Sequence, residues 1–284
     1  MPGFRHRAGA TKSSAPPRIV GLLGHGSRSC HDRLVLRRRL GLARLAVTLA
    51  LSLSAQLMVA RIAHGSNPYL EVPPGDEFSS SPAYRYANMT NDAAQAEIDR
   101  RRLPFAPETE PIVGVRLPGR LTGPMHGVWI HGTISGPEAT TVPFEILDGR
   151  LALALDDFCR VLAAHGIDEL VHFSIYRPPP RASASDGFLF RHSGALAIDV
   201  ASLRRSDGTW LRVEKDWPSA PGARTCGPSG RWSTEPNGRE LQSLVCEAKD
   251  LRLFHYALTP HYNRAHFNHV HLEIKPGVNW LLYN

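Results

Sequence analysis

Downstream of residue 85, apolar residues recur at two spacings, one typical of helices and the other of strands. The clearest helical pattern runs from 151 to 164, where Leu151, Leu155 and Phe158 share one face and Gly166 follows as a stop signal. Further helices are expected at 91–102, with Asn91 as N-cap, and at 238–250, and strands at 113–117, 128–133 and 170–175. Because these elements are mixed rather than alternating, we expect one α+β domain with a mostly antiparallel sheet and flanking helices.

The segment 269–274 has strand periodicity with polar residues on one face only. His269, His271 and Glu273 point to one side, and the apolar residues between them point to the other. One face of this strand can therefore hold a metal while the other packs into a core. Glu273 has two interpretations: it orients a ligand imidazole through the free ring nitrogen, or, as we expect, it is a plain solvent-facing carboxylate.

A second strand pattern places Asp199 on a face with two alanines, which leaves room beside the carboxylate for an ion. His192 precedes this strand across Ser193-Gly194, a flexible step that lets the imidazole fold back over Asp199. With His269 and His271, these residues form a ligand set for one zinc ion with a coordination position left open. A metallohydrolase is the first hypothesis. The alternative is that these are ordinary surface or core histidines.

Three stretches carry a family resemblance: 91–105, 191–200 (RHSGALAIDV) and 258–273, which contains LTPHYNRAH and NHVHLE. They resemble the extensin-like C-terminal domain of bacterial proteins, over about residues 85 to 284. That domain is in turn similar to zinc peptidases, which include D-alanyl-D-alanine carboxypeptidases, murein endopeptidases and the hedgehog-like fold. The resemblance implies a hedgehog/D-Ala-D-Ala-peptidase-like fold and peptidoglycan peptide cross-links as substrate.

The same resemblance implies a role for each residue of the site. His192, Asp199 and His271 are the implied Zn²⁺ ligands, and His269 is the implied catalytic imidazole beside the metal. Three protein ligands leave the fourth zinc position to a water whose proton is lost near neutral pH. His269 is suited to accept that proton, and His266 is a candidate second acid or base.

Arg177 ends a strand-like stretch and enters a proline-rich turn. In the related peptidases a Tyr-Arg pair of this kind presents the arginine to the substrate or to the developing oxyanion. A guanidinium beside a metal can bind a peptide carboxylate or stabilise tetrahedral charge. The alternative is a surface ion pair at the sheet edge.

Charge is divided unevenly along the chain. Residues 1–63 contain 11 Lys/Arg and one acid, a net charge of +10, and the remaining 221 residues contain 22 Lys/Arg and 25 Asp/Glu, a net charge of −3, which sums to the +7 of the whole chain. The folded part therefore has no basic excess, so we expect no nucleic-acid partner.

The basic segment 1–63 resembles a leader. Its apolar run of 16 residues, 45–60, is short for a transmembrane helix and typical of a signal peptide, although an uncleaved N-terminal anchor remains an alternative. Residues 64–84, rich in Pro, Gly and Ser, are expected to be a linker before a domain at 85–284. We therefore expect a periplasmic or secreted protein that meets the membrane only through its N-terminal segment.

Cysteine usage agrees with export. Cys226 and Cys246 bracket a Gly/Pro/Ser-rich stretch that needs closing, so we predict a disulfide between them. Cys159 lies at helical spacing among leucines and is expected to be a buried thiol. Together these observations favour an exported zinc-dependent hydrolase that acts as a peptidase on peptidoglycan cross-links. The alternative is a non-catalytic zinc-containing cell-wall-binding module.

Overall fold

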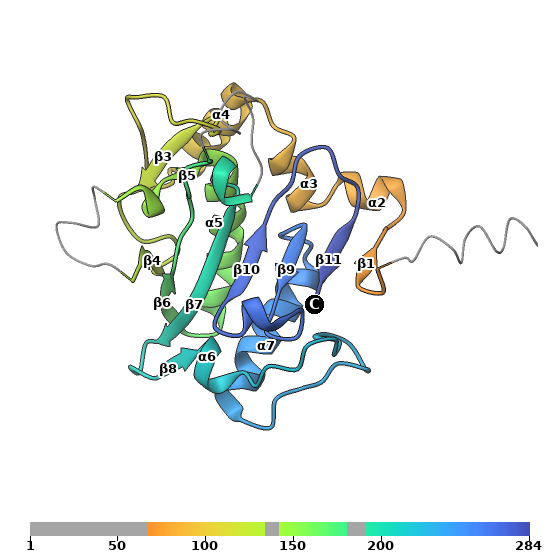
Figure 1. Cartoon of the computed structure of the whole chain (residues 1–284). Helices are drawn as coiled ribbons and strands as arrows, with labels where there is room; N and C mark the ends of the chain where they lie inside the picture. The colour runs from red at the N-terminus through yellow and green to blue at the C-terminus, as the bar shows by residue number, and fades with distance from the viewer. Residues whose placement is uncertain (1–66, 134–141, 181–190) are drawn as a thin grey trace, which may run out of the picture. The chain divides into compact units, whose positions relative to one another are not determined.

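The computed structural model describes residues 67–133, 142–180 and 191–284 (Figure 1). Its main feature is an eight-stranded sheet in the order β1-β11-β9-β10-β7-β6-β4, with β8 paired to β7. The β11/β9 and β4/β6 pairs are parallel and the other pairs are antiparallel. The strands are β1 (Leu70–Glu71), β4 (Trp129–Gly132), β6 (Ile167–His172), β7 (Ala197–Arg205), β8 (Trp210–Arg212), β9 (Tyr256–Leu258), β10 (Val270–Glu273) and β11 (Leu281–Tyr283).

Helices and a smaller sheet accompany this sheet. The helices are α2 (Gly75–Ser79), α3 (Pro82–Ala87), α4 (Asn91–Arg101), α5 (Gly149–Ala164), α6 (Val213–Asp216) and α7 (Pro236–Asp250), and the small sheet comprises β2 (Phe105–Pro107), β3 (Pro118–Leu121) and β5 (Leu147–Asp148). Two short 3-10 turns, η4 (Arg191–Gly194) and η5 (Arg264–His266), lie near the ends of β7 and β10. The expected α+β class with a mostly antiparallel sheet is confirmed.

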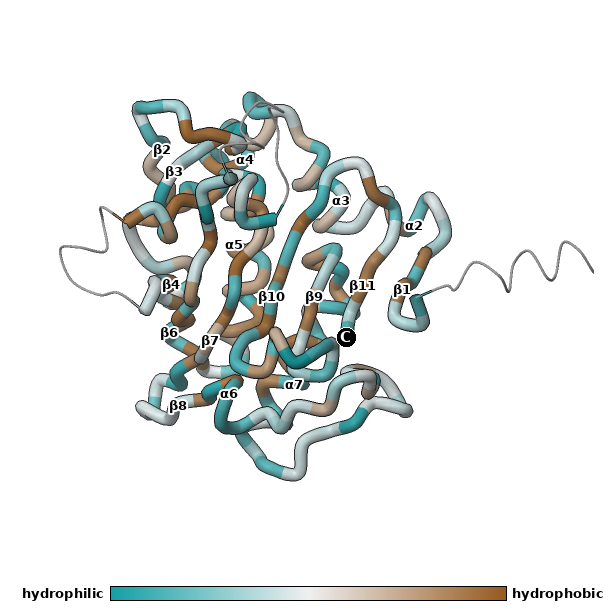
Figure 2. Tube along the Cα trace, in the orientation of Figure 1, coloured by the Kyte–Doolittle hydropathy of each residue, from teal (hydrophilic) through white to brown (hydrophobic). Residues whose placement is uncertain are grey.

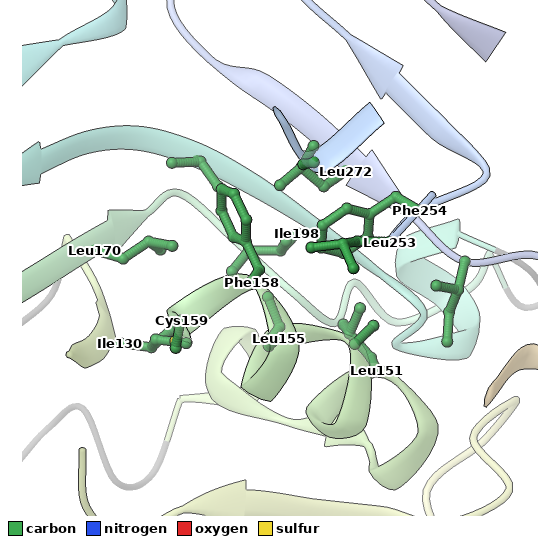
Figure 3. Packing of buried hydrophobic residues seen from close by; sticks show 14 of the residues in the cluster. Ile130, Leu151, Leu155, Phe158, Cys159, Leu170, Ile198, Leu253, Phe254 and Leu272 are labelled. Carbon is green, nitrogen blue, oxygen red and sulfur yellow. The ribbon is translucent and has the colours of Figure 1, made fainter. Parts of the chain in front are cut away.

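The core forms where α5 packs on one face of the sheet, behind β7 and β10 in Figure 1. The Asp148 carboxylate caps the helix by accepting from the Arg150 backbone N–H, and Gly166, at φ +72°, follows the helix end. Figure 3 shows Phe158 between the helix and the side chains of Ile198 and Leu272. Apolar residues gather in these central strands, brown in Figure 2. The odd-even alternation therefore leaves the polar residues of β7 and β10 on the face away from α5.

Several element boundaries differ from the sequence expectation. The strand expected at 113–117 is wrong, because the Asp148 carboxylate accepts from the backbone N–H groups of Arg116 and Leu117 and the strand begins at Pro118. The N-cap of α4 is Thr90 rather than Asn91, since the Thr90 hydroxyl accepts from the Ala93 N–H. The other helices and strands lie within three residues of their expected starts.

The described part of the expected linker, 67–84, belongs to the fold. Here β1 pairs with β11, and Phe78 of α2 is 1% exposed within the main core. This segment is therefore packed against the domain rather than a free linker, because its apolar side chains find partners in distant elements. The expected leader lies outside the described residues. No helix of the described segments is both long and apolar enough to cross a membrane.

Both cysteine expectations are confirmed within the described chain. Cys226 and Cys246 form a disulfide that joins the loop after α6 to helix α7. Cys159 is a buried thiol on α5, and burial raises its pKa well above the ordinary value. A buried thiol of this kind is held in its neutral form and contributes packing rather than reactivity.

Candidate metal centre

Two of the candidate ligands are cross-strand partners. Asp199 of β7 lies directly opposite His271 of β10 in the antiparallel register, and their neighbours Ile198 and Leu272 form the next pair on the opposite, core-facing side. Directly opposite residues of an antiparallel pair have Cβ atoms about 4.5–5.5 Å apart, so the register alone brings the carboxylate and the imidazole together. The predicted strand parity is confirmed for these two residues.

His192 reaches the same place from η4. The turn is closed by hydrogen bonds from the backbone N–H of Ala195 to the carbonyl of His192, 3.1 Å, and from that of Leu196 to the carbonyl of Arg191, 2.9 Å. Ala195 and Arg191 both have positive φ, 51° and 55°, in a region that residues other than glycine rarely adopt. This tight turn folds His192 back over the start of β7, as the sequence predicted.

Three ligand atoms converge. Nε2 of His192 lies 3.2 Å from Oδ1 of Asp199 and 3.2 Å from Nδ1 of His271, and the latter lies 3.0 Å from Oδ1 of Asp199. The three residues are between 2% and 8% exposed. Donor atoms of a tetrahedral zinc site with bonds near 2.1 Å are about 3.4 Å apart, so this triangle is close to the size that one zinc ion requires.

The second nitrogen of each ligand imidazole is engaged elsewhere. Nδ1 of His192 lies 2.8 Å from the carbonyl oxygen of Ile175, which can only accept, so Nδ1 carries the proton. Nε2 of His271 lies 3.2 Å from a carboxylate oxygen of Glu273 and donates in the same way. The two converging nitrogens are then acceptors that face the Asp199 carboxylate, an arrangement that needs a cation or a shared proton between them. The donor set therefore fits a metal ion.

The expectation that Glu273 faces solvent is wrong. Its side chain is fully buried, because the same face of the sheet continues into a small apolar cluster formed by Tyr256, Leu258 and Leu282. Glu273 thus takes the interpretation that we did not favour, as the partner that fixes the ring of His271. The guanidinium of Arg191 lies 3.7 Å from the same carboxylate.

Asp199 is held on its other side by an arginine. Arg177 is hydrogen-bonded to Oδ2 of Asp199, and its Nε donates to Oγ of Ser174 at 2.8 Å. The Arg177 side chain is 51% exposed, whereas Asp199 is buried, so the ion pair reaches from the surface to the centre. Sequence reasoning missed Ser174. The available signal was its position three residues before Arg177.

The pKa of Asp199 lies well below its ordinary value. Burial alone raises the pKa of this carboxyl, but hydrogen bonds and charge from His192 and His271 lower it by more. Asp199 is therefore an ionised carboxylate, the form that binds a metal.

His269 and His266 approach from the segment before β10. Nε2 of His269 lies 3.5 Å from Oδ1 of Asp199, and its Nδ1 lies 2.9 Å from Oδ1 of Asn268. The ring of His266 lies further from Asp199. Its centroid is 5.0 Å from that of His269 and 6.1 Å from that of His271. Its Nδ1 is hydrogen-bonded to Oδ1 of Asn263 at 2.8 Å. The structure therefore brings both imidazoles to the edge of the triangle without making either part of it.

Burial shifts the titration of both histidines. Burial lowers the pKa of His266 to about 4, with the neighbouring histidines adding to the effect. Burial also lowers the pKa of His269, although the Asp199 carboxylate opposes this shift. Both rings are therefore neutral near pH 7 and have a nitrogen lone pair available.

Comparison with known families agrees with the resemblance seen in the sequence. Residues 152–281 match the family model described as Extensin-like protein C-terminus. This region is similar to the extensin-like C-terminal domain. The match includes the three candidate ligands, His269 and Arg177, but it does not extend to the stretch at 91–105. Comparisons with curated proteins and with solved structures gave no match.

Proposed function

We propose that this chain is an exported zinc-dependent hydrolase, a peptidase that acts on the peptide cross-links of peptidoglycan. The observation that carries the metal assignment is the convergence of acceptor atoms from His192, Asp199 and His271 in a buried site. Export rests on the leader expected from the sequence. The wall substrate rests on the similarity of the extensin-like C-terminal domain to wall-cleaving zinc peptidases.

Zinc suits this donor set better than a hard cation. Two imidazole nitrogens and one carboxylate oxygen are typical of catalytic zinc sites, whereas Ca²⁺ and Mg²⁺ are bound mainly through oxygen atoms. When bound, zinc lowers the pKa of water toward neutrality and polarises a scissile carbonyl. Three protein ligands leave a coordination position for that chemistry, because a purely structural zinc site usually has four.

His269 is the proposed general base. Its Nδ1 donates to Asn268, so Nε2 carries the lone pair and faces the centre near Asp199. Its lowered pKa keeps the ring neutral at pH 7, which allows it to accept a proton and later return it to the leaving amine. His266 stands behind it at 5.0 Å between ring centroids and is the proposed second acid or base.

Arg177 is the proposed electrostatic partner of the substrate. Its guanidinium is bonded to Asp199 and Ser174, and half of the side chain stays exposed. A guanidinium in this position can hold a substrate carboxylate or the negative charge that develops on the attacked carbonyl oxygen. Arg177 therefore links the orientation of a ligand to the binding of the substrate.

The test uses the full chain and two histidine variants that differ in role. We expect wild type to keep about one zinc per chain after loading and dialysis, and to release new amino groups from purified sacculi. His271→Ala should lose the zinc and the cleavage. His269→Ala should keep the zinc and lose cleavage by roughly 10²–10⁴-fold.

His165→Ala is the matched control, because His165 pairs with Glu247 on the surface, and it should retain both properties. A wild-type chain that retains no zinc contradicts the proposal. A chain that binds zinc but releases no amines from sacculi is instead a non-catalytic zinc-containing cell-wall-binding module.

A further inference from the structure

Two loops meet in this structure, and one of them carries the histidines at the edge of the candidate metal centre. The histidine loop, residues 259–269, joins β9 to β10 and carries His266 and His269. The disulfide loop, residues 217–235, joins α6 to α7 and contains Cys226. In Figure 1 the disulfide loop, drawn in cyan, passes below the blue histidine loop. The mostly pale and teal tube in Figure 2 shows that the disulfide loop is poor in apolar residues, so specific contacts must hold it.

The central contact joins Trp217 of the disulfide loop to His261 of the histidine loop. The indole Nε1 donates to Nε2 of His261 at 3.2 Å, and the two rings meet edge to face with centroids 5.8 Å apart. Both side chains are almost fully buried, at 1% and 2% exposed. Burial lowers the pKa of His261, which keeps the ring neutral and able to accept. A buried bond of this kind fixes one loop relative to the other.

Further bonds fix the residues on either side of this contact. Thr225 and Thr259 share a hydroxyl–hydroxyl bond of 2.8 Å, and both are buried. The backbone N–H of Gly222 donates to the carbonyl of His261 at 2.8 Å, and the hydroxyl of Ser219 donates to the carbonyl of Pro260 at 2.9 Å. The disulfide loop therefore holds three consecutive residues, 259–261, at the root of the histidine loop.

The disulfide loop is itself anchored on α7. The Cys226–Cys246 disulfide ties it covalently to the helix, next to Thr225. The buried side chain of Gln242 donates to the Thr225 carbonyl at 2.7 Å. At the start of α7, a Cβ on Gly238 would lie 1.9 Å from the Asp216 carbonyl oxygen, so only glycine allows this close approach. Helix α7 thus supports the disulfide loop, which in turn supports the histidine loop.

We propose that the disulfide loop is a positioning element for the histidine loop. Trp217 and Thr225 are the positioning residues, and they act through His261 and Thr259 to set where His266 and His269 lie. The metal ligands are independent of this device, because they come from β7, β10 and η4. The positional claim stands on the contacts between the loops. Only its consequence for catalysis rests on the proposed function.

The disulfide makes the device sensitive to reduction. A cavity of about 460 Å³ is lined by both cysteines and by Trp232, which gives a small dithiol access. The dithiol donates two electrons and two protons, breaks the S–S bond, leaves two cysteine thiols and itself becomes a cyclic disulfide. The covalent tie beside Thr225 is then lost while every ligand residue stays in place.

The first test removes a single hydrogen-bond donor. Trp217→Phe deletes the indole N–H, and Trp232→Phe is the matched control, because its N–H bonds the Gly227 carbonyl within the same loop. We expect the backbone amides of 262–269 to exchange hydrogen about tenfold faster in Trp217→Phe and at the wild-type rate in the control. The amides of β7 and the zinc content should not change. If Trp217→Phe does not fold, Thr225→Val provides the same measurement through the hydroxyl pair.

The second test uses the disulfide. Reduction of wild type with dithiothreitol should speed exchange at 262–269, and a Cys226→Ser/Cys246→Ser variant should exchange fast from the start and not respond to the reductant. In the Cys226→Ser/Cys246→Ser variant, cleavage of sacculi should fall together with the faster exchange, as a lower kcat at constant zinc content. This measurement uses no reductant, because a dithiol itself binds zinc. The proposal is overturned if the disulfide loop exchanges faster on reduction or in Trp217→Phe while 262–269 does not. If wild type releases no amines, the proposed function fails, and the exchange measurements still decide the positional claim.

Discussion

Asp199 and His271 lie opposite each other on two adjacent central strands, whereas His269 and His266 reach the same centre from a loop. The strand pair is almost fully buried and is backed by the core of α5, and the loop histidines are half-buried. Strand register places the Cβ atoms of a directly opposite pair about 4.5–5.5 Å apart. A loop residue is placed only as well as the contacts at the root of its loop.

The ligand histidines and the loop histidines also differ in the residue that is hydrogen-bonded to the outer nitrogen of each ring. The ligand rings of His192 and His271 are bonded to Ile175 and Glu273, which lie in other parts of the chain or on the same buried strand. The loop rings of His269 and His266 are bonded to asparagines one and three residues away. The ligands are thus oriented by the domain, and the loop imidazoles are oriented by their own loop.

The largest effect is expected from the strand pair. Asp199→Ala leaves two imidazoles and no anionic ligand, so zinc affinity should fall by far more than the roughly 10–100-fold that an outer partner contributes. Asp207→Ala is the control, because Asp207 caps an exposed turn through the Thr209 N–H. Competition with a chromogenic zinc chelator measures both. An unchanged affinity in Asp199→Ala contradicts the ligand assignment.

An intermediate effect is expected from Glu273→Gln. The amide cannot hold the proton on Nε2 of His271 as strongly as the carboxylate does, so zinc affinity should fall by about 10–100-fold. Glu240→Gln is the control, because Glu240 pairs with Arg205 elsewhere on the sheet, and its zinc affinity should equal that of wild type. Equal affinities for both variants show that Glu273 is only a buried packing residue.

In the metal-free protein, we expect the pKa of His271 on the strand and the pKa of His266 in the loop to be shifted in opposite directions. Burial lowers the pKa of His271, but Asp199 and Glu273 raise it by more, so its net pKa lies above 6.5. The pKa of His266 is lowered to about 4. Ring-proton chemical shifts followed by NMR between pH 3 and 9 test this, with His266→Gln used to assign one signal.

The consequences for stability have opposite signs. The raised pKa of His271 adds stability that is complete below pH 6.5 and is lost as the pH rises through the folded-state pKa. The lowered pKa of His266 makes stability rise with pH between about 4 and 6.5, because the unfolded chain binds that proton more tightly. Denaturant unfolding of metal-free His266→Gln should therefore show a flatter pH dependence in that window. A curve that matches wild type contradicts the lowered pKa.

The smallest effect is expected from Ser174→Ala. The hydroxyl accepts one hydrogen bond from Arg177 and lies 3.5 Å from Asp199, so its loss removes about 1 kcal/mol of support, a factor of about five in zinc affinity. Ser243→Ala, on the exposed side of α7, is the control. A loss as large as that of Glu273→Gln would place Ser174 among the principal supports of the ligand carboxylate.

The sequence predicted the two ligand strands because the alternation of a strand depends only on residues that are close together in the chain. The alternation of polar and apolar residues fixes which side chains of 270–273 face the core, and it placed Asp199 and His271 on the other face. The same reasoning was wrong for Glu273, because the cluster that buries it comes from β9 and β11, which no local pattern assigns to that face. It also missed the packing of 67–84, which places Phe78 in the core.

The sequence by itself determined the helical face of α5, the parity of β7 and β10, the disulfide between Cys226 and Cys246, and the residue types suited to one metal ion. Tertiary structure alone decided the register that pairs Asp199 with His271, and the contacts that hold the histidine loop. The physical reason is distance along the chain. Periodicity is a property of a few neighbouring residues, whereas partners 44 to 79 positions apart meet only when the chain has folded.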